Sequence, residues 1–149
     1  MNRSIVIYVL GYILKTEGVL MSLPCFIALI YRETEGWAYF TVAIISILLG
    51  QLMTMRKPKD YVIYLKEGCV ATSLSWILMG VIGAIPFMIT GEIPSFINAL
   101  FEMVSGFTTT GASILSDVEA VSRCSTTWRC FSHWIGGMGV LVFIIAIVP

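Results

Sequence analysis

Charged side chains are what this sequence has least of. Only 12 % of its 149 residues are Asp, Glu, Lys or Arg, whereas 58 % are hydrophobic. Soluble domains carry about 25 % charged residues. The nine basic and nine acidic residues cancel, so the chain also lacks the basic excess of a nucleic-acid-binding protein. The composition excludes an ordinary soluble domain and predicts an all-α integral membrane protein in contact with the lipid bilayer.

Residues for catalysis and metal binding are equally scarce. The chain has one histidine, His133, and four cysteines without a CxxC pair or a Cys/His cluster, so no transition-metal site is expected. No Ser/His/Asp set and no phosphate-cradling glycine loop is present, so we expect neither an enzyme nor a bound cofactor. His133 fits a hydrogen-bonded structural residue better than a ligand. Whether Cys124 and Cys130 form a disulfide stays open.

Long apolar runs are abundant and predict four membrane spans, at about residues 4–31, 37–55, 68–89 and 128–149. The first contains Lys15, Glu17 and Pro24. It is either an interfacial turn followed by a span or a single tilted helix whose charges face protein, and Pro24 should kink it. Gly80 and Gly83 in the third span predict close helix contacts.

The stretch FINALFEMVSGFTTTGAS, residues 96–113, departs from this pattern. Its apolar helix, at about 95–107, reaches roughly 18 Å, little more than half of the ~30 Å hydrocarbon core. Three β-branched threonines and Gly111 then end the helix. Extended backbone at membrane depth is tolerated only inside protein or along a watery cavity. We therefore expect residues 108–113 to form a filter strand whose carbonyls replace the hydration shell of a cation.

Two further features complete this interpretation. The end of a helix carries partial negative charge, which favours a cation beside residue 107. Glu102 within the half-helix either bonds to the filter backbone from behind or lies at a wet edge. Ser95 is a plausible N-cap of the half-helix.

Basic residues set the expected orientation. The cluster at 56–60, followed by Lys66, is the densest in the chain and should be cytoplasmic. The N-terminus is then cytoplasmic, the turns at 32–36 and 90–94 are outside, and the filter faces the outer half of the membrane. The chain divides into two leading transmembrane helices with the basic loop, residues 1–60, and a helix–pore-loop–helix repeat resembling that of potassium channels, residues 61–149.

The sequences of two segments resemble those of a known protein family. FEMVSGFTTTGASIL and WRCFSHWIGGMGVLVFIIAIVP resemble the Trk/Ktr/HKT superfamily of potassium transporters. The two spans before the repeat, and RKPKDYVIYLKEG, resemble the N-terminal portion of a Trk-type potassium-uptake membrane subunit. The resemblance implies four non-identical repeats in one chain, each with one filter strand. It also implies a homodimer in the cell membrane, gated by a cytosolic nucleotide-binding ring that often binds NAD(H) or ATP.

The resemblance also implies roles for individual residues, with K⁺ as the transported ion and its only metal. Gly111 is the residue most tied to potassium selectivity. The K⁺ ligands, mainly backbone carbonyls, are Thr108, Thr109, Thr110 and Gly111. Filter support comes from Ala112, Ser113 and Glu102, and inner-helix packing from Trp134, Gly136, Gly137 and Gly139.

The chain contains one such repeat rather than four. We therefore expect a fragment of a longer protein that supplies one of four filter strands. Two alternatives stay open. One is a homotetrameric cation channel, and the other is a small accessory or assembly protein whose residues 108–113 form an extracellular loop. The sequence does not distinguish channel-like from ion-coupled transport.

Overall fold

The structure is a computed structural model that describes residues 3–58, 64–117 and 120–147. Within these ranges the regular secondary structure is entirely α-helical, and the predicted all-α membrane fold is confirmed. Three helical segments are long and apolar enough to cross a membrane: Arg3–Tyr31, Gly36–Met55 and Lys66–Thr90. The helices are α1 (Arg3–Leu20), α2 (Ser22–Tyr31), α3 (Gly36–Met55), α4 (Leu65–Thr90), α5 (Phe96–Phe107) and α6 (Arg123–Ile147).

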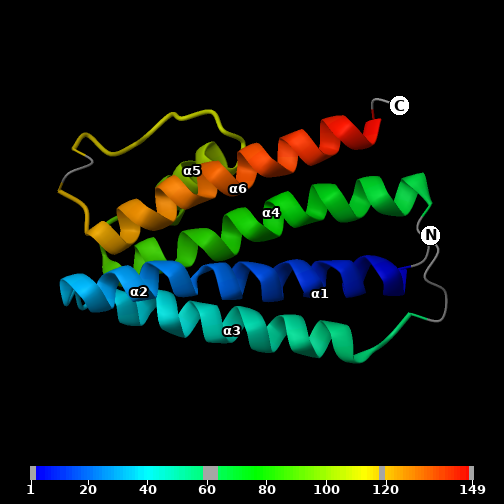
Figure 1. The fold of residues 1–149 in the computed structure, drawn as a ribbon, viewed down its shortest axis with the longest axis horizontal. Coiled ribbons are helices and arrows are strands. Elements are labelled where there is room, and N and C mark those ends of the chain that lie inside the picture. Colours follow the sequence, from blue (N-terminus) through cyan, green and yellow to red (C-terminus); the bar gives the residue numbers. More distant parts are fainter. Residues whose placement is uncertain (1–2, 59–63, 118–119, 148–149) are drawn as a thin grey trace.

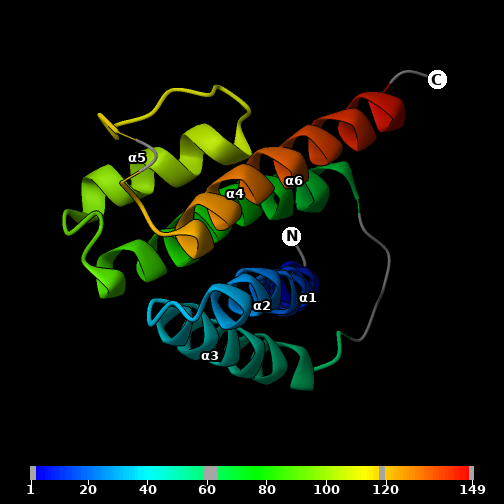
Figure 2. The ribbon, with the colours of Figure 1, turned by 60° about the vertical axis from the view of Figure 1, so that its left-hand side comes forward.

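The long helices lie side by side along one axis (Figure 1). The turn between α2 and α3, the turn between α4 and α5, and the start of α6 share one end, whereas both chain ends lie towards the other. A second view separates the α1–α2–α3 hairpin from the group formed by α4, α5 and α6 (Figure 2). The short α5 packs on α4 and α6, and the chain after it runs back to the end from which α5 started. This is the course of a re-entrant segment.

The first span is broken rather than continuous. α1 ends at Leu20 and α2 begins at Ser22, so the expected bend lies just before Pro24. Proline has no N–H to donate to the carbonyl four residues earlier, here Leu20, and its ring crowds that carbonyl. Glu17 is 1 % exposed, so its side chain faces protein, as the second of the two interpretations expects, although that interpretation expected one continuous helix. Lys15 lies with Nζ 5.0 Å from the centre of the Tyr12 ring.

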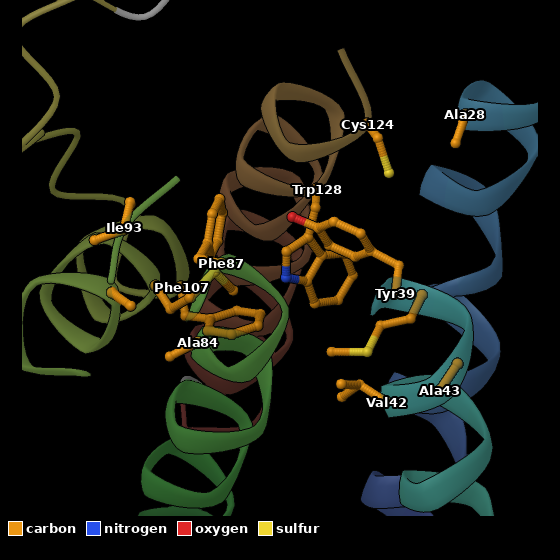
Figure 3. Close-up of a cluster of buried hydrophobic side chains, with 13 residues drawn as sticks. Ala28, Tyr39, Val42, Ala43, Ala84, Phe87, Ile93, Phe107, Cys124 and Trp128 are labelled. Carbon is orange, nitrogen blue, oxygen red and sulfur yellow. The ribbon is translucent and has the colours of Figure 1, made fainter. Parts of the chain in front are cut away.

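Aromatic side chains join the two groups of helices (Figure 3). Tyr39 of α3 meets Phe87 of α4 edge to face, with ring centres 6.4 Å apart. The Tyr39 hydroxyl donates to Ser125 Oγ at 2.8 Å, and the Trp128 indole donates to the Gly83 carbonyl at 3.2 Å. Buried Tyr and Trp need such partners for their polar ends. These contacts hold α6 against both α3 and α4.

Glycines bring α4 close to α5, as predicted. A Cβ at Gly80 would lie 3.2 Å from the Val104 side chain, and one at Gly83 only 2.6 Å from Met103 Cε. In membranes, small residues of this kind let helix backbones approach. Ser95 is the N-cap residue of α5, as predicted, and its backbone is extended, but its hydroxyl makes no capping hydrogen bond.

The inner helix starts earlier than expected. It was predicted over about 128–149, but α6 already begins at Arg123. The Glu33 carboxylate accepts the N–H groups of Arg123 at 3.0 Å and Cys124 at 2.9 Å, and Glu92 accepts that of Ser122 at 2.7 Å. Glu33, before α3, and Glu92, before α5, thus satisfy free N–H donors at the start of α6. The sequence did not predict these two distant partners.

Three remaining expectations concern the cysteines, the basic cluster and the helix predicted over about 68–89. Cys124 is buried with its thiol donating to the Pro24 carbonyl at 3.2 Å, whereas Cys130 is exposed, and neither forms a disulfide. In the basic cluster, Lys59 and Asp60 lie outside the described residues. The outer helix, predicted over about 68–89, is α4 with slightly wider bounds.

Candidate functional site

The half-helix α5 rests directly on α6. A Cβ at Gly136 of α6 would overlap the carbonyl oxygen of Phe107, the last residue of α5. A Cβ at Gly106 would overlap the hydroxyl of Ser132. Hydrogen at both positions lets the two backbones touch, so the end of α5, where the Thr/Gly strand begins, is positioned by α6.

The strand after α5 is tied back to that helix through its amide groups. The N–H groups of residues 108–110 donate at 2.9 Å to the carbonyls of Val104, Gly106 and Ser105, respectively. These carbonyls belong to the last turn of α5, which otherwise lacks donors. The N–H groups of residues 108–110 are therefore all hydrogen-bonded to α5.

Unusual backbone angles turn the strand. Thr109 has φ 57° and Gly111 has φ 76°, both in the left-handed region. For a β-branched residue this conformation is rare, and it costs roughly 1–2 kcal/mol, whereas glycine adopts it freely. The Thr108 carbonyl accepts the Thr109 hydroxyl at 2.7 Å. Within the described residues, no protein donor bonds the carbonyls of Thr109, Thr110 or Gly111.

Two side chains of α5 hold the returning strand. Glu102 is 1 % exposed, and its carboxylate accepts the Ser113 hydroxyl at 3.0 Å and the Ile114 N–H at 2.9 Å. The Ser105 hydroxyl donates to the Ala112 carbonyl at 2.5 Å. Glu102 therefore does not lie at a wet edge, and the backbone group that it binds is the Ile114 N–H, directly after the predicted filter residues.

Sequence reasoning missed the partner of Glu102. Arg129 of α6 donates through Nε to this carboxylate, so an ion pair links the half-helix to the inner helix. The two side chains are 14 % and 0 % exposed. Because a charged residue within an apolar span usually has a partner inside the protein, Arg129 itself was the available signal.

The residues predicted to pack the inner helix differ in whether they contact another helix. A Cβ at Gly137 would have Thr109 Cγ2 as its neighbour at 3.9 Å, and one at Gly139 would meet the Trp76 ring at 3.6 Å. Trp134 is 59 % exposed and stacks on Phe131 of its own helix, so within this chain it does not pack against another element. His133 Nδ1 lies 2.9 Å from the Arg129 carbonyl, a structural hydrogen bond within the helix.

The donor set at this site is made of oxygen atoms. Where side chains are described, no three His, Cys, Asp or Glu residues gather into a group suited to a metal ion. The exposed groups on residues 108–113 are peptide carbonyls and threonine or serine hydroxyls. Such neutral oxygens can replace the water around a monovalent cation.

Comparisons with known proteins agree with this architecture. The sequence model of the TrkH family, described as cation transport protein, matches residues 36–149. An uncharacterized cation transporter of Methanocaldococcus jannaschii, MJ1485, is 31 % identical over 138 residues, 92 % of this chain and 29 % of its own. The Trk system potassium uptake protein TrkG of Escherichia coli K12 is 33 % identical over 154 residues, covering 100 % of this chain and 32 % of its own.

A solved structure gives the same result in three dimensions. The crystal structure of the potassium transporter TrkH from Vibrio parahaemolyticus matches with a TM-score of 0.90 and 30 % sequence identity, over 100 % of this chain and 32 % of that one. The chain therefore spans about a third of the length of the relatives that it matches. By its family match, by the identity of these relatives and by its fold, the chain is a membrane protein that belongs to the TrkH family of cation transport proteins.

Proposed function

We propose that this chain contributes one selectivity-filter strand to a Trk-type potassium uptake pore. One observation carries the proposal. The half-helix α5 ends in a segment whose N–H groups at residues 108–110 donate back to the helix and whose carbonyls at residues 109–111 have no donor within the described protein. The names of the relatives, potassium uptake and potassium transporter, support K⁺ as the ion.

The residues of the site take distinct roles in this proposal. Carbonyl oxygens of Thr108, Thr109, Thr110 and Gly111 bind dehydrated K⁺, and the negative end of α5 adds to the attraction. Ala112, Ser113 and Glu102 keep the strand in register through the bonds described above. The close approach of Gly136 to Phe107 fixes the position of the strand along the axis of α6.

A single strand cannot surround an ion, so three others are needed. Because the chain spans about a third of its relatives' length, we infer that they come from further repeats of a longer chain. The face that would meet them is apolar and open. A groove of about 370 Å³ lies beside the filter strand there, between it and the exposed side of α5, and Ile97, Phe101, Val104, Ser105, Thr108 and Thr110 line it.

The remaining parts of the proposal concern orientation and partners. The N-terminus is cytoplasmic, and the half-helix enters from the outside of the cell membrane, as the basic cluster at 56–60 indicates. The complete protein forms a homodimer that a cytosolic nucleotide-binding ring regulates. The chain itself binds no cofactor other than the transported ion.

Uptake of rubidium, a potassium analogue, tests where the other strands come from. Cells deficient in potassium uptake would express either these 149 residues or the chain extended by its downstream coding sequence. We expect uptake from the extended chain only. Uptake by the short chain would instead favour a homotetramer. No uptake by either would contradict a transport role and favour an accessory protein.

Cysteine accessibility tests the filter strand itself. In the extended chain with the exposed Cys69 and Cys130 replaced by serine, Thr110→Cys is expected to react with a thiol reagent more slowly as K⁺ is raised. The matched control is Thr34→Cys, an exposed threonine on the turn between α2 and α3, whose labelling K⁺ should not change. Labelling of Thr110→Cys that K⁺ does not slow would identify residues 108–113 as an ordinary loop.

A further inference from the structure

A buried carboxyl group in the first span has no role in the filter. Glu17 lies on α1, one turn before the helix break at Met21, and is 1 % exposed. Both of its carboxyl oxygens are buried and have no hydrogen-bond partner among the described residues. A charged carboxylate in such a place is strongly unfavourable, because burial removes it from bulk water and no described side chain is hydrogen-bonded to it.

The surroundings place this carboxyl against the pore half-helix. Glu17 Oε1 lies 3.5 Å from the position that a Cβ at Gly83 would take. The same position is bordered by Met103 Cε at 2.6 Å and Phe107 Cε2 at 3.5 Å, both from α5. The absent side chain at Gly83 thus makes room for the carboxyl beside α4 and the last two turns of α5. Ser46 of α3, the helix packed along α1, has a second fully buried oxygen without a partner.

Other titratable groups near α1 are engaged elsewhere. Lys15 lies over the Tyr12 ring, and the Cys25 thiol of α2 donates to the Met21 carbonyl. On α3, the Tyr39 hydroxyl donates to Ser125, and on α5, Glu102 is held by Arg129. The ionisable residues of α4, namely Lys66, Glu67 and Cys69, stand in its first turns, roughly four turns from Gly83.

Complete burial also limits what could bind there. The helices of this chain already cover Glu17, so a side chain from another repeat or subunit cannot reach it without separating them. A proton needs no such space and removes the charge. Neutral carboxylic acid is therefore the form that fits the site.

We propose that Glu17 is an intramembrane proton-binding site that keeps its proton at neutral pH and releases it only when α1 and α4 separate. Release leaves a charge beside Met103 and Phe107 and weakens the support of α5. Alkaline pH therefore favours loosening of the half-helix. The proposal concerns protonation and packing, and it holds whether or not the strand at 108–113 conducts ions.

Infrared spectroscopy of the purified full-length protein tests it directly. At neutral pH the wild type is expected to show the carbonyl stretching band of a protonated carboxyl group, and Glu17→Gln to lose it. The control Glu35→Gln changes a carboxyl on the outer turn and should retain the band. Glu17→Asp, which keeps the acid but shortens its stem, should shift the band and serves if Glu17→Gln does not fold.

The pH dependence of the melting temperature is a second test, because a residue with only a structural role would not change it. From neutral to alkaline pH, the melting temperature of the wild type is expected to fall more steeply than that of Glu17→Gln, which cannot ionise. The Glu35→Gln control should follow the wild type. A wild type and a Glu17→Gln variant with the same infrared bands at neutral pH would overturn the proposal.

Discussion

Replacing Gly136 by alanine is expected to displace the end of the pore half-helix. The new Cβ would overlap the Phe107 carbonyl oxygen and would lie 2.7 Å from the carbonyl carbon and 3.0 Å from Cα of the same residue. All three atoms are backbone, so no side-chain rotation relieves the overlap. The end of α5 must instead move away from α6 by roughly 1 Å to restore ordinary contact, and the filter strand moves with it.

The energetic cost follows from two opposing terms. Overpacking of a close-packed contact costs about 1–3 kcal/mol. Alanine recovers about 1 kcal/mol through its higher helix propensity. The net loss of stability is therefore small, about 0–2 kcal/mol, whereas a shift of about 1 Å in a preorganised binding geometry can reduce a rate about 100-fold. Transport should suffer far more than folding.

The neighbouring glycine provides a matched control. A Cβ at Gly137 would meet only Thr109 Cγ2 at 3.9 Å, an ordinary contact. In the full-length protein we expect Gly137→Ala to keep rubidium uptake and to gain up to about 1 kcal/mol from helix propensity, while Gly136→Ala loses uptake at nearly unchanged expression. Equal uptake by the two variants would refute the argument that contact at Gly136 positions the filter.

Three further predictions concern Gly111, the Glu102–Arg129 pair and Glu33, all in the full-length protein. Gly111→Ser should lower the preference for K⁺ over Na⁺ in competition uptake assays, because serine is strained at the φ of 76° and alters a proposed filter position. Unchanged selectivity would show that Gly111 does not line the filter. Glu102→Gln leaves Arg129 without its counter-charge, which should cost about 3–5 kcal/mol in thermal or denaturant unfolding. The added change Arg129→Gln should restore part of this loss, and purely additive effects would contradict a coupled pair. Glu33→Ala removes two bonds to the start of α6 and should cost about 0.5–2 kcal/mol in the same unfolding assay, unlike Glu35→Ala, and equal effects of these two would refute the cap.

Local features made much of the architecture predictable. The half-helix was recognisable because a mostly apolar helix of twelve residues is too short to cross the bilayer and three threonines with a glycine follow it. The break in the first span was recognisable from Pro24, whose missing N–H disrupts the bond to Leu20. Signals of this kind depend on residues within one or two turns of each other. The role of the strand at 108–113 as a filter remains a prediction.

Contacts between distant residues were not predictable in the same way. Glu33 reaches the start of α6 across 90 positions, and Glu102 reaches Arg129 across 27. Trp134, expected to pack the inner helix, is exposed in this chain, because the direction of a side chain on a helix depends on what lies beside it. The bounds of α6 and the partners of both carboxylates required the packed structure.

The amino-acid sequence by itself determined the membrane class, the number and lengths of the apolar segments and the place where the half-helix stops. These follow from hydropathy and backbone preference, which each residue expresses locally. Only the tertiary structure decided which glycines allow contact, which carboxylates are paired and that Glu17 is buried without a partner. Those properties arise when helices from separate parts of the chain exclude water between them, and they depend on atoms that no local pattern brings together.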